Sequence, residues 1–243
     1  MKRIYVVGIG PGDRKYLTGA AARVLEECQV IVGYTAYVDL LKADYPEKIF
    51  LTTPMKQETE RCRMAFEEAA KGMETAMVCS GDSGIYGMAG LMYQIGQEYP
   101  EVDLIIVPGI TAASAGAAVL GAPLMHDFAV ISLSDLLTPW EKIEKRLIAA
   151  AMADFVICLY NPSSRKRADY LERACDLILQ YKSSDTVCGL VRNIGRMGET
   201  YEILPLGEMR NKKVDMFTTV YIGNRETREI GGKMITPRGY RNV

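Results

Sequence analysis

The stretch "RIYVVGIGPGD", from Arg3 to Asp13, decides the fold, because a continuous apolar run passes directly into a turn with three glycines. An apolar run without polar alternation indicates a strand that is buried on both faces. The residues that follow place apolar side chains at helical spacing from Leu17 to Cys28. A buried strand, a glycine turn and a helix in this order predict an α/β domain with a parallel sheet.

Two further glycine-bearing turns follow predicted strands. "SGDSGIYGMAG", Ser80 to Gly90, comes after "TAMVC", and "VPGITAASAG", Val107 to Gly116, ends the apolar run "DLIIV". Ligands of open parallel sheets bind beyond the carboxyl ends of the strands, so we expect the three turns to share one edge. Glycines there would let a ligand reach bare backbone N–H and C=O groups. A tight turn without a ligand is the alternative for any one of them.

The second half of the chain has a different pattern. Glycine and proline interrupt the periodicity near Leu120 to Phe128, which divides the chain into predicted domains 1–122 and 123–243. The last apolar runs, 199–206 and 216–223, follow each other without a convincing helix, which indicates antiparallel pairing and a mixed sheet. Residues 236–243 are predicted to be a loose tail. The other predicted strands are 3–9, 30–32, 75–79, 103–109, 128–133, 154–160 and 186–191. The predicted helices are 17–28, 58–72, 88–98, 140–152 and 167–181, with a helix of small residues after 109.

Composition excludes several classes of function. No apolar stretch of the 243 residues approaches the roughly 20 that a membrane helix needs. The first strand begins at once and leaves no room for a signal peptide, so we expect a cytoplasmic protein. The six cysteines are scattered and there is one histidine, so we predict core thiols and no metal site. Residues 124–243 carry 18 Lys and Arg against 15 Asp and Glu, which suits a polycarboxylate ligand or a solvated face but not nucleic acid.

The glycine turns exclude two common nucleotide motifs. "GIGPGD" lacks the Lys-Ser/Thr of a phosphate-binding P-loop. Its G-x-G-x-G spacing, with Pro11 in the turn, is a poor dinucleotide fingerprint, and the second strand ends in "VIVGYT" without the expected acid. An adenosine ligand without phosphates, such as S-adenosylmethionine, fits better.

Five segments together carry a family resemblance: "GIGPGD", "VGYTAYVDLL", "SGDSGIYGMAG", "VPGITAASAGAAVLGAPLMHDFAVISLSDLLTPW" and "DFVICLYNPSSRKR". From Ile4 to about Tyr221 the chain closely resembles the precorrin-3B C17-methyltransferase family of cobalamin biosynthesis. "GxGPGD" is shared by the wider tetrapyrrole methyltransferase superfamily, whereas "GDSGIYGMA" and "HDFAVISLSDLLTPW" are much narrower.

The resemblance implies two α/β domains with S-adenosylmethionine in the cleft between them, in a homodimer. The implied reaction is methylation of C17 of a precorrin-3 level macrocycle, coupled to ring contraction. Ser83 stands where the superfamily usually has proline, and Asn161 where many relatives have methionine. Tyr34 and Tyr37 follow the second strand, where some members have a catalytic acid, so that role does not transfer. The implied cofactor contacts are Pro11, Ser80, Gly81, Asp82, Ile85, Thr111, Ala112, Tyr160 and Asn161.

Proton transfer and substrate binding are assigned to the second half. Histidine commonly exchanges protons near neutral pH, so His126 is the candidate proton carrier, with Asp127 as a weaker one. Ser132, Arg165, Lys166 and Arg167 are candidate contacts of the substrate carboxylates. For the three cations, a solvated helix start is an equal alternative.

Three other functions remain open from the sequence. They are another tetrapyrrole or diphthine-type methyltransferase, a nicotinamide-dependent oxidoreductase, and a macrocycle-binding protein without turnover. The sequence does not decide between a metal-free, oxygenated substrate and one that carries cobalt.

Overall fold

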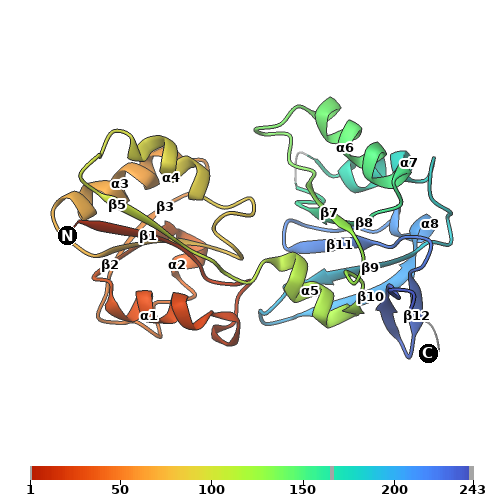
Figure 1. Ribbon diagram of the computed structural model, residues 1–243, viewed down its shortest axis with the longest axis horizontal. Coiled ribbons are helices and arrows are strands. Elements are labelled where there is room, and N and C mark those ends of the chain that lie inside the picture. The colour runs from red at the N-terminus through yellow and green to blue at the C-terminus, as the bar shows by residue number, and fades with distance from the viewer. Residues whose placement is uncertain (1, 165–166, 241–243) are drawn as a thin grey trace. The chain divides into compact units, whose positions relative to one another are not determined.

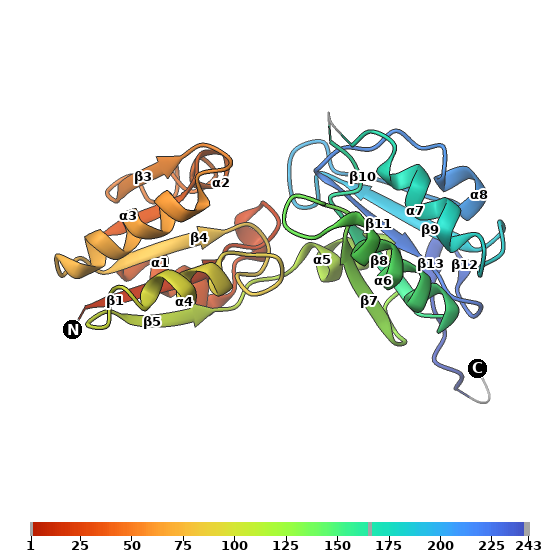
Figure 2. The ribbon, with the colours of Figure 1, turned by 90° about the horizontal axis from the view of Figure 1, so that it is seen from above.

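The computed structural model describes residues 2–164 and 167–240, and it forms two compact units, 1–112 and 113–243. Figures 1 and 2 show one sheet with its helices in each unit. The sequence places the break ten residues later, between 122 and 123. The difference is α5 (Ala112–Leu120), whose small side chains pack against strands of the second unit. No helix in the described part of the chain has the length and apolar character to cross a bilayer.

The sheet of the first unit is parallel throughout, with strand order β3-β2-β4-β1-β5. This confirms the predicted parallel sheet. One strand, β3, escapes the sequence analysis because it is a half-exposed edge strand without a fully apolar run. The elements are β1 (Arg3–Gly8), η1 (Arg14–Tyr16), α1 (Gly19–Glu27), β2 (Val30–Tyr34), α2 (Thr35–Val38), β3 (Ile49–Thr53), α3 (Glu58–Ala70), β4 (Thr75–Cys79), α4 (Ala89–Gly96) and β5 (Asp103–Val107).

Helices cover both faces of this sheet. Alternate residues of β1 face opposite ways, so Val6 packs with α3 and α4 while Val7 packs with α1 and α2. Figure 1 shows α1 on one side of the sheet and α3 with α4 on the other. With both faces buried, the ends of the strands and their loops are what this sheet offers to a ligand.

The sheet of the second unit is mixed, as predicted, with strand order β10-β9-β11-β8-β7. The last two apolar runs do form antiparallel pairs, but β9 lies between them and pairs with both. Helices α6, α7 and α8 pack on one face of the sheet, and α5 packs on the other. The elements are β7 (Phe128–Ser132), α6 (Trp140–Met152), β8 (Val156–Tyr160), α7 (Tyr170–Ile178), β9 (Val187–Arg192), β10 (Thr200–Pro205), α8 (Leu206–Met209) and β11 (Thr218–Ile222).

A small third sheet, in the order β12-β13-β6, consists of β12 (Arg228–Ile230), β13 (Lys233–Ile235) and β6 (Gly121–Ala122). Strand β13 runs parallel to β6 and pairs Met234 with Gly121. Thr236 was expected to begin a loose tail, but it is buried and its N–H donates to Ala122 O at 3.1 Å. Thr236 is therefore packed against the rest of the unit and does not belong to a loose tail.

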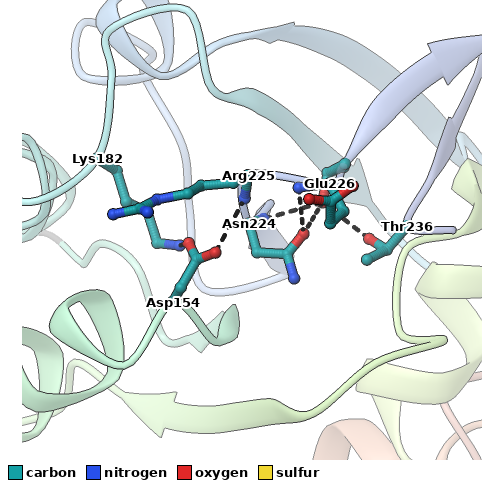
Figure 3. Close-up of polar contacts among 7 residues, drawn as sticks. Asp154, Lys182, Asn224, Arg225, Glu226 and Thr236 are labelled. Carbon is teal, nitrogen blue, oxygen red and sulfur yellow. Dashed lines mark hydrogen bonds and ion pairs between the residues drawn. The ribbon is translucent and has the colours of Figure 1, made fainter. Parts of the chain in front are cut away.

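A polar network lies where β8 begins and β11 ends (Figure 3). Lys182 is 7% exposed, and its Nζ donates to Asp154 Oδ1 at 2.9 Å. The other carboxylate oxygen, Asp154 Oδ2, accepts from the backbone N–H of Arg225 at 3.3 Å. The Thr227 hydroxyl donates to Asn224 Oδ1 at 3.1 Å and lies 2.8 Å from the Thr236 hydroxyl. These buried groups bind one another, as the interior of a protein requires.

Candidate functional site

The three glycine-bearing loops of the first unit follow β4, β1 and β5, which are neighbours in the sheet. The predicted common edge is therefore confirmed by the strand order. The first two loops are also paired directly. Gly10 N–H donates to Gly81 O at 3.1 Å, and Gly81 N–H donates to Gly10 O at 2.7 Å.

Glycines in these loops have two different causes. A Cβ on Gly8 would lie 2.6 Å from the backbone nitrogen of Gly109, so the loops after β1 and β5 pack backbone against backbone. Gly81 has room for a Cβ, at 3.8 Å from its neighbours, but its φ of +70° is one that side chains rarely adopt. Gly8 is therefore needed for the close packing of two loops, and Gly81 is needed for the direction of the backbone after β4.

Asp82 joins the loops after β4 and β5 through its carboxylate. Oδ1 accepts from the N–H groups of Gly84 at 2.8 Å and Ile85 at 3.0 Å, and Oδ2 accepts from Gly109 N–H at 2.9 Å. Hydrogen bonds to an ionised acceptor are stronger than neutral ones. Asp82 is thus placed to fix the backbone of the edge.

Ser83 is a residue whose role the sequence analysis misses. It is fully buried, and its hydroxyl donates to Val107 O at 3.2 Å, at the end of β5. A proline has no hydroxyl and could not make this bond. The departure from the superfamily pattern therefore has a structural role, but its partner is 24 residues away and left no signal in the sequence.

The other predicted cofactor residues of the first unit lie on or beside the same edge. Pro11 is buried after β1, and Ser80 is half-buried after β4. Thr111 and Ala112 are half-buried after β5, and their backbone lies 3.8 Å from the position of a Cβ on Gly81. Ile85 is 42% exposed. The structure brings together the set that the resemblance implies for this unit.

The second unit has its own polar edge at the carboxyl ends of β7 and β8, which run parallel. Asn161 follows β8 with a φ of 53°, and its Nδ2 donates to Ser132 Oγ at 3.0 Å. The same hydroxyl oxygen accepts from Ser134 N–H at 3.2 Å. Two residues that the sequence assigns to different ligands, Ser132 and Asn161, are therefore in contact.

Arg167 connects the next loop to this edge. Its Nη1 donates to Ser134 Oγ at 2.9 Å, and its Nε lies 3.2 Å from Asp135 Oδ1. The Tyr170 hydroxyl donates to Asp135 Oδ2 at 2.7 Å, and this hydrogen bond to a carboxylate raises the pKa of Tyr170. The predicted substrate contacts Arg165 and Lys166, just before Arg167, lie outside the described residues.

Tyr160 ends β8 and is the remaining predicted cofactor contact. Its hydroxyl accepts a hydrogen bond from Ala113 N–H at 2.6 Å, in the first turn of α5. The hydroxyl of Tyr221, on β11, donates to the carbonyl of the same Ala113 at 2.9 Å. The sequence gives Tyr221 no role, because it stands in an ordinary apolar strand pattern.

His126 and Asp127 are exposed and precede β7. The carbonyl of Asp127 accepts from Val156 N–H at the first residue of β8. They are thus at the amino end of β7, whereas Ser132 is at its carboxyl end, and five strand residues span about 16 Å. The structure does not bring the candidate proton carriers to the polar edge of the second unit.

The cysteines are core residues, as predicted. All six are buried. Burial raises the pKa of the thiols of Cys28 and Cys79 to about 11, and those of Cys62 and Cys175 to about 12. Within residues 2–164 and 167–240 no three His, Cys, Asp or Glu side chains are grouped so that they could hold a metal ion.

Comparison with known proteins gives the class to which this fold and edge belong. The family described as Tetrapyrrole (Corrin/Porphyrin) Methylases matches residues 3–210. The chain belongs to the tetrapyrrole methylase family. It is a methyltransferase of cobalamin biosynthesis, the process to which its full-length relatives contribute.

Two curated relatives match over nearly their whole length. One from Salmonella typhimurium, named probable cobalt-factor III C(17)-methyltransferase, is 48% identical over 97% of this chain and 98% of its own. One from Sinorhizobium sp, named precorrin-3B C(17)-methyltransferase, is 40% identical over 98% of this chain and 96% of its own.

Solved structures agree with the fold. The crystal structure of the methyltransferase CobJ covers 98% of this chain and 100% of its own, with a TM-score of 0.90 and 34% identity. A uroporphyrin-III C-methyl transferase from Thermus thermophilus, solved with S-adenyl homocysteine, covers 91% of this chain and 97% of its own, with a TM-score of 0.69 and 22% identity. The second likeness concerns the fold alone.

Proposed function

We propose that the chain binds S-adenosylmethionine at the glycine edge of the first unit and methylates C17 of a precorrin-3 level macrocycle, coupled to contraction of the ring. The relatives named for C17 methylation, at 48% and 40% identity, support this reaction. The alternative within the family is another tetrapyrrole substrate, and we rank it second because the full-length relatives carry the C17 name.

The observation that carries the proposal is the chemistry of the glycine edge. The segments 8–13, 80–90 and 107–113 form it from backbone and small side chains, with two aspartates and no lysine or arginine. Within these three segments no cation is available for the phosphates of a dinucleotide, which weighs against a nicotinamide enzyme. It suits a neutral ribose and adenine, which need backbone hydrogen bonds, and a sulfonium, which is a cation.

The residues of the chain would act by orientation more than by covalent chemistry. When bound, S-adenosylmethionine supplies an electrophilic methyl group, and the macrocycle supplies the carbon that accepts it. Pro11, Ser80, Gly81 and Ile85 would contact the adenosyl part, and the Asp82 carboxylate would hold the loop that presents them. Placing two reactants in the geometry of attack is itself a large contribution to rate.

The second unit would hold the macrocycle and its carboxylates. Ser132, with Arg165 and Lys166, remains our proposal for these contacts, and Asn161 would reach the cofactor from the same edge. The hydrogen bond between Asn161 and Ser132 supports a shared role, because it holds the two side chains at the same edge. His126 is proposed as a proton carrier of minor weight, with Asp127 as its weaker alternative, because both lie at the amino end of β7 and away from the polar edge. A homodimer in the cytoplasm completes the proposal, and sedimentation velocity tests its oligomeric part.

A matched pair of glycine variants tests the cofactor edge. Gly81→Ala adds a Cβ at a φ of +70°, whereas Gly90→Ala adds one where nothing lies within 4 Å. We expect calorimetry to show that S-adenosylhomocysteine binds the wild type and Gly90→Ala alike, and Gly81→Ala at least tenfold more weakly. Equal affinity for all three would refute the assignment of this loop.

Product analysis tests the reaction. The enzyme is incubated with S-adenosylmethionine and either the metal-free, oxygenated macrocycle or the cobalt-containing one. We expect one form of the macrocycle to gain about 14 mass units, because one methyl group replaces one hydrogen atom. A spectral change should report contraction of the ring. In parallel, S-adenosylhomocysteine should raise the melting temperature and NAD should not, because only a ligand of the native state stabilises it.

A further inference from the structure

The backbone N–H and C=O of one residue at the start of α5, Ala113, are both bound by tyrosine hydroxyls. Tyr160 accepts from the N–H of Ala113 at 2.6 Å, and Tyr221 donates to its C=O at 2.9 Å. Strands β8 and β11 are antiparallel neighbours, with Tyr221 opposite Cys158. Since alternate residues share a face, Tyr160 and Tyr221 point to the same face of the sheet, where α5 lies.

The Tyr221 side chain is fully buried, and burial raises its pKa well above the ordinary value for tyrosine. Its hydroxyl therefore stays protonated and remains a donor to Ala113 throughout the range in which the protein works. A buried hydroxyl of this kind also loses its solvation unless it has a partner. The bond to Ala113 provides one.

Gly116 is what allows the Tyr221 hydroxyl to reach α5. A Cβ at Gly116 would lie 2.8 Å from Ile194 Cδ1 and closer still to the Tyr221 hydroxyl. Glycine inside a helix costs about 1 kcal/mol relative to alanine. The close approach of Tyr221 explains why the alanine-rich helix has a glycine at this position.

The segment before Ala113 is fixed at its other end as well. Gly109 N–H donates to Asp82, and the backbone of Thr111 and Ala112 lies beside Gly81. Only residues 110–112 separate the two anchored positions. Ala112 is the first residue of α5 and is bonded directly to Ala113, so the contacts of Ala113 set the direction in which the chain enters the helix from Thr111 and Ala112.

We infer that Tyr221 is a positioning residue for the cofactor, which acts through Ala113 to fix the backbone of Thr111 and Ala112. The inference rests on the proposed function, because it takes these two residues as cofactor contacts. Tyr160 holds the N–H of the same residue. Gly116 is part of the same arrangement, because its missing side chain leaves the space that the Tyr221 hydroxyl occupies.

Two variants test the inference from opposite directions. Tyr221→Phe removes only the hydroxyl, and Gly116→Ala displaces it while raising intrinsic helix propensity. In each, we expect the dissociation constant of S-adenosylhomocysteine to rise about threefold to tenfold, the value of one hydrogen bond. The KM for S-adenosylmethionine should rise by a similar factor with little change in kcat. The double variant should bind S-adenosylhomocysteine no more weakly than the weaker-binding single variant, because both changes remove the same contact.

Tyr201→Phe is the matched control. Tyr201 is 45% exposed on β10, where its hydroxyl accepts from Lys233, and its loss should leave cofactor affinity within twofold. A merely structural Tyr221 would lower the melting temperature and leave the affinity of the folded protein unchanged, and that result for Tyr221→Phe overturns the inference. Absence of S-adenosylhomocysteine binding by the wild type would instead overturn the proposed function.

Discussion

Asp82, just after β4, and Asp154, just before β8, each join segments that are far apart in the sequence, but their partners differ. Asp82 accepts from three backbone N–H groups and has no cationic partner in the described part of the chain. Asp154 pairs with Lys182, a side chain that is 3% exposed, and accepts from one backbone N–H (Figure 3).

The difference separates the edge that we propose as the cofactor site from a scaffold whose buried polar groups bind one another. At Asp82 the carboxylate organises the backbone of two glycine-bearing loops. At Asp154 the acid balances a buried charge, and the neighbouring hydroxyls and amide bind one another. Changes at Asp82 should therefore alter binding, and changes at Asp154 should alter stability.

The largest effect is expected at the ligand edge. Asp82→Ala removes the acceptor of three charge-assisted hydrogen bonds, so the loops after β4 and β5 lose their link. We expect S-adenosylhomocysteine to bind about 100-fold more weakly, roughly 3 kcal/mol, by calorimetry. Asp13→Ala is the control, because Asp13 is the other acid of the glycine loops and only caps the short helix after it. An equal loss of S-adenosylhomocysteine affinity in both variants would contradict a special role of Asp82.

The scaffold should respond in stability and not in binding. Asp154→Asn leaves the Lys182 charge buried without its acid, which should cost about 2–3 kcal/mol of unfolding free energy. Lys182→Met should cost less than about 1 kcal/mol, because the Asp154 side chain is 32% exposed and can be hydrated. Urea unfolding measures both values. An affinity for S-adenosylhomocysteine that falls in either variant would contradict the scaffold role.

His126 offers a smaller effect. General acid–base catalysis contributes a factor of about 10²–10⁴, but only for a group within reach of the reacting atoms. Because His126 lies at the amino end of β7, we expect His126→Ala to slow methyl transfer and contraction less than tenfold and to leave cofactor affinity unchanged. Product masses and absorption spectra follow the two steps. A loss of 10² or more in either would place the imidazole at the macrocycle after all.

The cysteines should show the least change under native conditions. Burial raises the pKa of the Cys28 thiol to about 11 and that of Cys62 to about 12, so both stay protonated at pH 8 and out of reach of reagent. We expect a thiol-reactive dye to label none of the six cysteines in the folded protein and all six in denaturant. Above about pH 9 the unfolded chain loses thiol protons that the folded one keeps, so the unfolding free energy should fall as pH rises. Rapid native labelling would contradict the core placement.

The sequence was sufficient where one physical signal dominates a segment. Apolar runs ending in glycine predicted β1, β4 and β5, and the parallel rule then placed their loops on one edge. It failed for β3, β12 and β13, because short strands with exposed residues carry little hydrophobic pattern.

Roles that depend on distant partners were also missed. Ser83 and Tyr221 act on the carbonyls of Val107 and Ala113, and nothing in their local sequence reveals those contacts. The division between the units at 112 and 113 also depends on distant contacts, since α5 packs against Tyr221 and Ile194 of the second unit.

The pairing of β13 with β6 has a consequence for how the chain folds during synthesis. Every strand of the first sheet lies before residue 108, so that unit has its complete sheet long before translation ends. The second unit has to wait, because Met234 pairs with Gly121 across more than a hundred residues and is fully buried there. Domains generally fold as they emerge, the N-terminal one first. The glycine edge can therefore form on the ribosome, whereas a chain that stops before residue 233 leaves β6 without its neighbour and a hole where Met234 belongs.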